Sequence, residues 1–175
     1  MNNKTVPPPS FEVTYEMMAS KSRRFLNYLI DVVAMYIIIF LLAMLVASLA
    51  VVFEWDETLI WMQNITPFQN YSIGFCVVLL YYGLPETLSS RTLGKLVTGT
   101  KVVMEETGAK PTAEAILKRT LCRFIPFEAI SFIGESSRGW HDSISRTVVV
   151  DVKKYKEEIN LKLSFEELGN EQDVA

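Results

Sequence analysis

A charged pair lies at the start of the longest apolar run of the sequence. Arg24 and Asp31 are seven residues apart, so a helix would place them on nearly the same face, roughly 10 Å apart along its axis. Asn27 and Tyr28 lie between them on that face. A lone carboxylate on a membrane helix is costly and needs a partner or water. This polar stripe therefore predicts either a structural ion pair or a protonatable site on an ion or proton path.

Basic residues that could neutralise Asp31 occur later in the chain. Arg119 and Arg123 are four residues apart, so a helix would place both on one face. We expect one of them to pair with Asp31 and to fix how their helix docks. The full set of candidate charge partners is Arg91, Arg119, Arg123 and Arg146. Because the two long apolar runs hold no further acid, a structural role is preferred over ion transport.

His141 and Asp142 are sequence neighbours, a pair that indicates catalysis only beside a nucleophile. The sequence offers no recognisable nucleophile or phosphate-binding loop. His141 is the only histidine, and the two cysteines lack metal-ligand spacing. Asp142 is therefore interpreted as an anchor for local backbone or as a partner of Arg138 or Arg146. We predict a protein that is not an enzyme, with no bound metal or cofactor.

Two apolar runs are long enough to span a membrane, which takes about 20 residues as a helix. The run over residues 25–53 contains Asp31 as its only formal charge, and the run over residues 68–84 contains none. Half of the 175 residues are hydrophobic, and the mean hydropathy is +0.22. We predict a two-helix transmembrane hairpin with its first span at about 25–53 and its second at about 68–84.

Lysine and arginine are unevenly distributed along the chain. The connector over residues 54–70 has neither, but it contains three acids and two tryptophans, whereas residues 86–123 are rich in both basic types. The positive-inside rule places the N-terminus and residues 86–123 in the cytoplasm. We therefore expect a multi-pass protein of the bacterial inner (plasma) membrane with both termini cytoplasmic. The net charge of −3 does not indicate nucleic-acid binding.

Further elements are expected on the cytoplasmic side. The β-branched stretches 96–104 and 147–152 could pair as a small sheet. Thr112 is a good helix N-cap, and the apolar spacing after it predicts an amphipathic interfacial helix over about 113–133, lying on or re-entering the membrane. A third full span from Ile116 is the alternative. It would cost about 2.5 kcal/mol or more per central charge and would move the C-terminus outside.

The predicted fold class is mainly α: a two-helix transmembrane hairpin, an interfacial or cytoplasmic amphipathic helix and a small two-stranded β element. Residues 1–20, with their triple proline, are expected to be a flexible leader. Residues 21–152 form the membrane domain. Residues 153–175 form a charged tail that we expect to be partly disordered.

Three motifs in this order resemble the RDD family of bacterial integral membrane proteins, named for one arginine and two aspartates. Arg24 and Asp31 in Arg-Phe-Leu-Asn-Tyr-Leu-Ile-Asp resemble the first two of these residues. Residues 91–103 resemble the segment after the second helix of the family, and Asp142 in Trp-His-Asp-Ser-Ile-Ser-Arg resembles the second aspartate. The resemblance covers about residues 20–152. Ser145 stands where Gly or Ala is common, and the third apolar run is short, which leaves open whether it spans the membrane.

The resemblance implies a location and a topology more than an activity. The molecular role of the family is largely undefined, although transport has been suggested, with cation/proton antiport in some members. Since two spans cannot enclose a solute path, we predict an accessory or scaffold subunit of a membrane complex. Its partners would be the lipid bilayer and either copies of itself or other membrane subunits. The alternative is a transporter component for a monovalent cation or proton, with Asp31 as the protonatable site.

Overall fold

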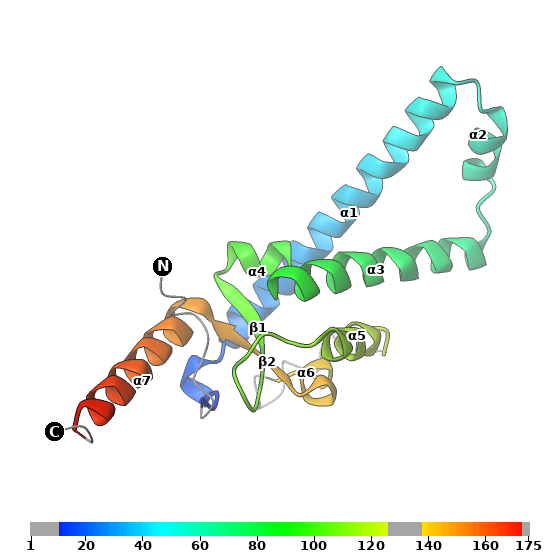
Figure 1. The fold of residues 1–175 in the computed structure, drawn as a ribbon. Helices are drawn as coiled ribbons and strands as arrows, with labels where there is room; N and C mark the ends of the chain where they lie inside the picture. Colours follow the sequence, from blue (N-terminus) through cyan, green and yellow to red (C-terminus); the bar gives the residue numbers. More distant parts are fainter. Residues whose placement is uncertain (1–10, 126–137, 173–175) are drawn as a thin grey trace.

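The computed structural model of this chain describes residues 11–125 and 138–172, with side chains up to residue 165. It is mostly helical, with one small sheet (Figure 1). In chain order the described elements are the 3₁₀ helix η1 (Tyr15–Met17), α1 (Lys21–Val52), α2 (Asp56–Gln63), α3 (Pro67–Ser89), α4 (Leu93–Val97), β1 (Thr100–Met104), α5 (Ala113–Cys122), α6 (Trp140–Ser145), β2 (Thr147–Asp151) and α7 (Val152–Gln172).

Within the described residues, α1 and α3 are the two helices long and apolar enough to cross a membrane. Ser20 caps α1 by accepting a hydrogen bond from the Arg23 N–H, and Thr66 and Gln69 form a capping box at the start of α3. The two helices cross near one end and diverge toward α2 (Figure 1). Both include the predicted apolar runs.

Helix α3 continues beyond the predicted end of its apolar run at residue 84. It passes through Pro85 and ends at Ser89, and Ser90 follows in the left-handed conformation with φ 60°. Pro85 removes one backbone donor, and such a loss inside a helix must be offset by other contacts. The burial of Tyr82 and Glu86 on either side of Pro85 shows that tertiary packing supports this turn.

The two predicted β-rich stretches pair as an antiparallel sheet, except that residues 96–99 of the first belong to the end of α4 and the turn after it. Thr100 lies opposite Asp151, and Met104 lies opposite Thr147. The central valines of both strands are almost completely buried, and Met18 adds an isolated bridge to Val150. The prediction of a small two-stranded β element is confirmed.

The N-terminal segment and α7 pack together against this sheet. Tyr155 and Ile159 are one helical turn apart on α7, and both are buried with Phe11 and Met17. The Tyr155 hydroxyl donates a hydrogen bond to the Gly108 carbonyl at 2.7 Å. Residues 11–19 and 153–172 thus take defined positions, in contrast to the flexible leader and the partly disordered tail expected from the sequence. Each segment buries its apolar side chains against the other, and neither pattern reveals this partner.

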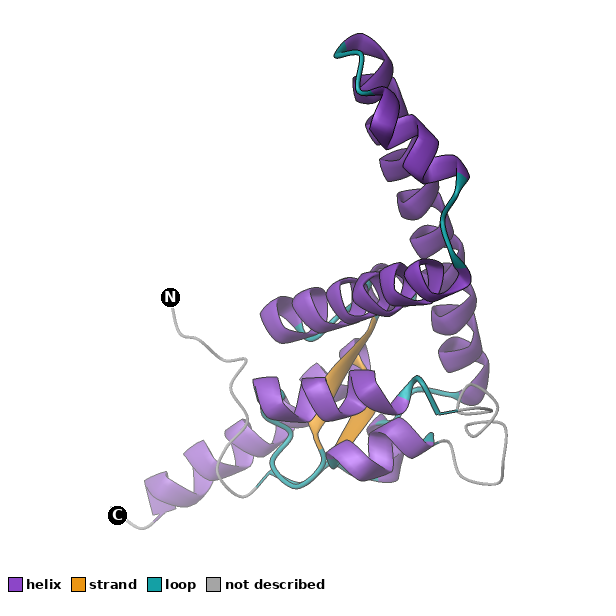
Figure 2. Cartoon of the chain, turned by 90° about the vertical axis from the view of Figure 1, so that its right-hand side faces the viewer, coloured by secondary structure: helices purple, strands orange, loops and turns teal. Residues whose placement is uncertain are grey.

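Helix α5 begins where the sequence predicts, because the Thr112 hydroxyl accepts a hydrogen bond from the Ala115 N–H at 3.1 Å. It lies beside α3 (Figure 2). Ile116 and Thr120 of the predicted apolar face are buried, but so is Arg119 of the predicted polar face, whereas Leu117 and Leu121 are 53% and 44% exposed. The reason is that its neighbours α3 and α6 offer it carboxylates. The later part of the predicted 113–133 helix, residues 126–133, lies outside the described residues.

Candidate functional site

Most buried charges of the molecule gather in a region that we call the base. The base comprises the start of α1, the end of α3, and α4, α5, α6 and the sheet. Seven of its charged residues are less than 9% exposed: Arg24, Asp31, Glu86, Lys95, Arg119, Asp142 and Asp151. Buried charges are rare unless they are paired and hydrogen-bonded. The base is therefore the candidate functional site.

Asp31 is held by three hydrogen-bond donors. The Tyr81 hydroxyl donates to Oδ1 at 2.9 Å, and the Gly94 N–H donates to the same oxygen at 2.8 Å. The Thr92 hydroxyl donates to Oδ2 at 2.7 Å. The residue is 2% exposed. Since these donors lie on α3 and at the start of α4, the carboxylate joins both elements to α1.

The arginines that were expected beside Asp31 lie elsewhere. Arg119 Nε is 3.2 Å from Glu86 Oε2, and Arg123 Nη2 is 3.5 Å from Glu86 Oε1. Arg91 follows α3 and is partly exposed, and Arg146 Nη1 is 3.6 Å from an exposed Glu106 oxygen. The expected Asp31–arginine pair is thus replaced by hydroxyl and amide donors. The physical reason is that α5 lies along α3, where its arginines meet Glu86.

Gly94 permits the close approach between α4 and α1. A Cβ atom at this position would lie 2.4 Å from the Asn27 carbonyl oxygen and 2.9 Å from Asp31 Oδ1. The Asn27 side-chain amide hydrogen-bonds to the hydroxyls of Thr98 and Thr100 just beyond. The polar stripe of α1 is therefore covered by the segment that follows α3.

Asp142 is the centre of a second set of contacts. Arg24 forms an ion pair with its Oδ2, and Arg119 forms one with its Oδ1. The Gly139 N–H donates to Oδ2 at 3.1 Å, and His141 Nε2 lies 3.4 Å from Oδ1. Burial alone would raise the pKa of Asp142, but Arg119, His141 and Arg24 hold it well below its usual value. Asp142 is therefore a buried anion that joins α1, α5 and α6.

From the sequence, Asp142 was interpreted as an anchor for local backbone or as a partner of Arg138 or Arg146. The structure shows the backbone contact and neither arginine pair. The hydrogen bond from Gly139 to Asp142 anchors local backbone, as expected. Arg138, however, forms a bidentate pair with Glu105, at 2.6 and 2.7 Å. The actual partners come from distant segments, because burial of Asp142 under α1 and α5 excludes the more exposed neighbours.

Glu86 is an essential part of the base that the sequence did not reveal. The Lys95 ammonium donates to its Oε1 at 2.8 Å, and both residues are buried. Burial lowers the pKa of Lys95, and Glu86 opposes that shift. Glu86 was missed because Gly-Leu-Pro before it predicts the end of a helix. Lys95 lies nine residues after Glu86, beyond a turn, and this spacing was the signal in the sequence for the pair.

The comparison with protein families gives a clear result. The sequence matches the RDD family over residues 18–146. The chain belongs to the RDD family. Family membership and the two apolar helices together indicate that this RDD protein is a membrane protein. Neither the curated proteins nor the solved structures include a match.

The ion pairs of this RDD protein form one connected network. Arg119 contacts both Glu86 and Asp142, so contacts run from Lys95 through these three residues to Arg24. They connect α4, α3, α5, α6 and α1. Asp31 adds a further link between α1 and α4. The residues singled out by the resemblance, Arg24, Asp31 and Asp142, therefore all join α1 to the rest of the base.

Within the described residues, no group of three or more His, Cys, Asp or Glu side chains could hold a metal ion. Asp142 is the acid nearest to His141, and two arginines already contact this carboxylate. The arrangement is suited to holding elements in fixed positions.

Proposed function

We propose that this RDD protein is a non-enzymatic accessory or scaffold subunit of a membrane complex. The observation that carries the proposal is the engagement of Asp31, whose two oxygens accept hydrogen bonds from three donors. A carboxylate held in this way stabilises one conformation, whereas an ion carrier must exchange its partners. Arg24 and Asp142 support the same role, because each connects separate helices. The base is then a rigid platform attached to two apolar helices.

We infer that α1 and α3 span the bacterial inner membrane as a hairpin. The connector over residues 54–70 lacks lysine and arginine, and the base contains many of both, which favours a cytoplasmic base and cytoplasmic termini. Trp55 at the start of α2 and Trp61 within it are 54% and 45% exposed. Exposed tryptophans of this kind suit the outer headgroup region. The exposed leucines and isoleucines of α1 would be covered by lipid.

We infer also that α5 enters the membrane from the cytoplasmic side. The rings of Phe124 and Phe75 lie 4.6 Å apart between centroids. Phe75 is fourteen residues before Ser89 on α3, a rise of roughly 21 Å along that helix. Lipid would then cover the exposed Leu117 and Leu121, while the arginines of α5 face Glu86. These contacts favour a re-entrant element over a helix lying flat on the surface.

The opening between α1 and α3 favours a role in a complex. A cavity there is lined by apolar residues of both helices, including Met35, Ile39 and Val78. In a bilayer such an opening must be filled by lipid or by a helix of another subunit. Interfaces between membrane helices depend on this kind of close van der Waals packing.

The decisive experiment compares the wild-type protein with Asp31→Asn, which keeps one oxygen acceptor but removes the charge. Both are purified, placed in sealed vesicles and tested for sodium/proton exchange with an internal pH dye. The proposal expects no exchange above that of empty vesicles. It also expects Asp31→Asn to lose a membrane protein that co-purifies stoichiometrically with the wild type.

The matched control is Asp56→Asn in the exposed connector, which should behave as wild type in both assays. Exchange by the wild type that disappears in Asp31→Asn would support the transporter alternative instead. Topology is tested separately with a reporter fused near residue 60, which the proposal expects outside the cytoplasm.

A further inference from the structure

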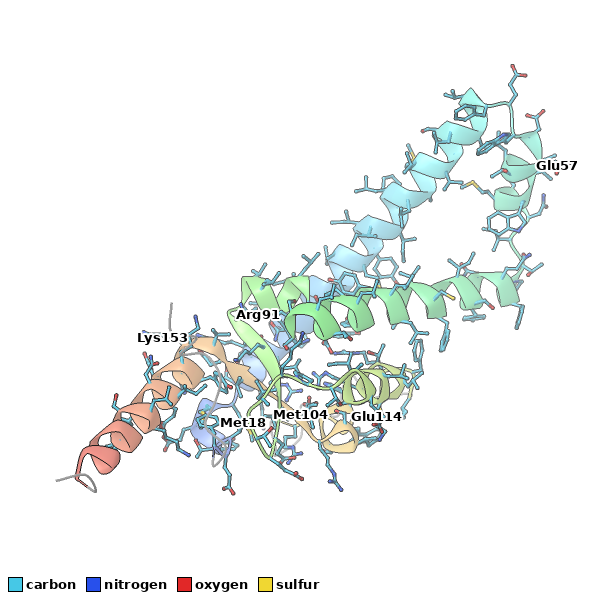
Figure 3. The ribbon with its side chains drawn as sticks, in the orientation of Figure 1. Met18, Glu57, Arg91, Met104, Glu114 and Lys153 are labelled. Carbon is cyan, nitrogen blue, oxygen red and sulfur yellow. The ribbon has the colours of Figure 1, made fainter. Side chains whose placement is uncertain are left out.

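Three basic residues from separate elements lie near one end of β1. Arg91 lies in the turn between α3 and α4, Lys101 on β1 and Lys156 on α7. The Val102 N–H donates to the Ser90 carbonyl at 2.9 Å, which places the turn beside β1. The N–H of residue 152 donates to the carbonyl of residue 99 at 3.0 Å, which brings α7 to the same end. Figure 3 shows Arg91 and the start of α7, labelled at Lys153, on this side of the molecule.

Lys101 is the central cation of this cluster. Its Nζ lies 3.5 Å from the centroid of the Tyr155 ring, which is itself buried. Burial, together with the positive charges of Arg91 and Lys156, lowers the pKa of Lys101 to about 8. Both charged neighbours that act on it are cations, in contrast to Lys95, which Glu86 neutralises. An anion placed among these three groups would relieve their mutual repulsion.

An apolar ledge lies next to the cluster. Leu93, Leu96 and Val97 of α4 are 47%, 52% and 72% exposed. Gly94 lies between Leu93 and Leu96 in the sequence and faces α1, because its N–H donates a hydrogen bond to Asp31. The cluster begins at Arg91, two residues after the end of α3. Cations beside an apolar ledge at the end of a membrane helix match the shape and charge of a phospholipid.

We propose that Arg91, Lys101 and Lys156 bind the phosphate of an anionic phospholipid in the inner leaflet. The acyl chains of this lipid would lie over the apolar ledge of α4. The inference rests on the proposed topology, because it requires the end of α3 to lie at the headgroup level. Each cation near an anionic membrane surface contributes a factor of about five to binding.

The test is titration of the purified chain in a neutral detergent with phosphatidylglycerol and, separately, with zwitterionic phosphatidylcholine. Native mass spectrometry measures the bound fraction of each lipid. We expect phosphatidylglycerol to bind at least about tenfold more tightly. The double variant Arg91→Gln/Lys101→Gln should weaken phosphatidylglycerol about 25-fold and leave phosphatidylcholine unchanged.

Two further variants separate the loss of a lipid contact from misfolding and from a change in net charge. Lys156→Gln alters an exposed side chain and should cost about fivefold without disturbing the packing of Lys101 on Tyr155. Lys118→Gln is the matched control, because it makes the same change in net charge at an exposed pair with Glu114. It should bind both lipids as the wild type does. Circular dichroism and gel filtration confirm that each variant is folded.

Three results would overturn the inference. These are equal binding of the two lipids, an equal loss in Lys118→Gln, and displacement of the lipid by inorganic phosphate at matched concentration, which would assign the cluster to a soluble anion. Carbonate extraction of membranes tests independently whether the chain is an integral membrane protein, and the reporter near residue 60 tests its topology. A chain that stays in the membrane pellet but does not prefer phosphatidylglycerol refutes the lipid site alone.

Discussion

The base of this RDD protein and the diverging parts of α1 and α3, which we call the arms, differ in where their contacts come from. In the base, Arg119 is 1% exposed and contacts two carboxylates from other elements. In the arms, side chains such as Leu42 and Leu45 are more than half exposed, and the helices diverge (Figure 1). The base therefore obtains its contacts from its own chain, and the arms must obtain theirs from their surroundings.

This difference separates two physical roles. Apolar side chains in lipid are nearly insensitive to which neighbour they touch, so the arms determine location more than geometry. Buried ion pairs are sensitive to distance and partner, so the base determines geometry. Such pairs are not necessarily more stabilising than apolar packing, but removing one partner is strongly destabilising.

The largest expected effect is that of Asp142→Asn. The change removes the carboxylate shared by Arg24 and Arg119, both of which are buried. We expect a loss of about 3–5 kcal/mol in the free energy of unfolding, measured by chemical denaturation in detergent micelles. Glu114→Gln, at an exposed pair with Lys118, should lose less than about 0.5 kcal/mol. Similar losses for both variants would contradict the distinction between buried and exposed pairs.

The second test compares apolar packing in the core between α7, the sheet and the N-terminal segment with packing in the arms. Ile159→Ala removes a side chain that is 1% exposed and should cost about 2–5 kcal/mol. Leu45→Ala removes one that is 54% exposed and should change stability by less than about 0.5 kcal/mol in micelles. The same denaturation assay measures both. A large loss for Leu45→Ala would show that the arms pack within the protein after all.

The third test uses two glycines. Gly94→Ala would place a Cβ atom 2.4 Å from the Asn27 carbonyl oxygen, so α4 must move away from α1, at a cost of about 1–3 kcal/mol. Gly83→Ala meets nothing within 4 Å and should be neutral or stabilising by up to about 1 kcal/mol, because alanine favours helix. The melting temperatures of the two variants, measured by thermal unfolding, test this difference in stability. Equal behaviour would mean that the close contact at Gly94 is absent in the membrane protein.

The smallest expected effect concerns a cation of the base that lies among other cations. The pKa of Lys101 is lowered from 10.5 to about 8, first by burial and then by Arg91 and Lys156. The unfolded chain keeps this proton up to about pH 10.5, so stability should rise between about pH 8 and 10.5. NMR of the lysine Nζ groups should find one midpoint near 8, and Arg91→Gln should raise it. If that substitution leaves the titration midpoint of Lys101 unchanged, Arg91 does not belong to the cluster.

Much of the architecture could be predicted from the sequence. The apolar runs of α1 and α3 and the β-branched stretches of the sheet carry their own periodicity and composition. Arg24 and Asp31 were singled out by their helical spacing, and the resemblance added Asp142, although the partners of all three were not predicted. Arg24 and Asp142 are 118 residues apart, and no local pattern connects residues at that distance.

The remaining differences have specific physical causes. The spacing on α5 does not show that Arg119 is buried beside Ile116, because that depends on the carboxylates of other elements. Pro85 predicts the end of α3, yet tertiary contacts extend the helix and bury Glu86. Phe11 was missed because its partner, Tyr155, lies 144 positions later in the chain.

The separation of Arg24 from Asp142 has a consequence for biogenesis. Chains fold from their N-terminus during synthesis, so α1 is made long before the carboxylate that neutralises Arg24. Until the ribosome reaches Asp142, the Arg24 guanidinium must remain hydrated, and Arg119 has only one of its two carboxylates, that of Glu86. Completion of the network is therefore a late event, and a nascent chain that stops short of α6 would contain the Glu86 pairs without the link from Arg24 to α5.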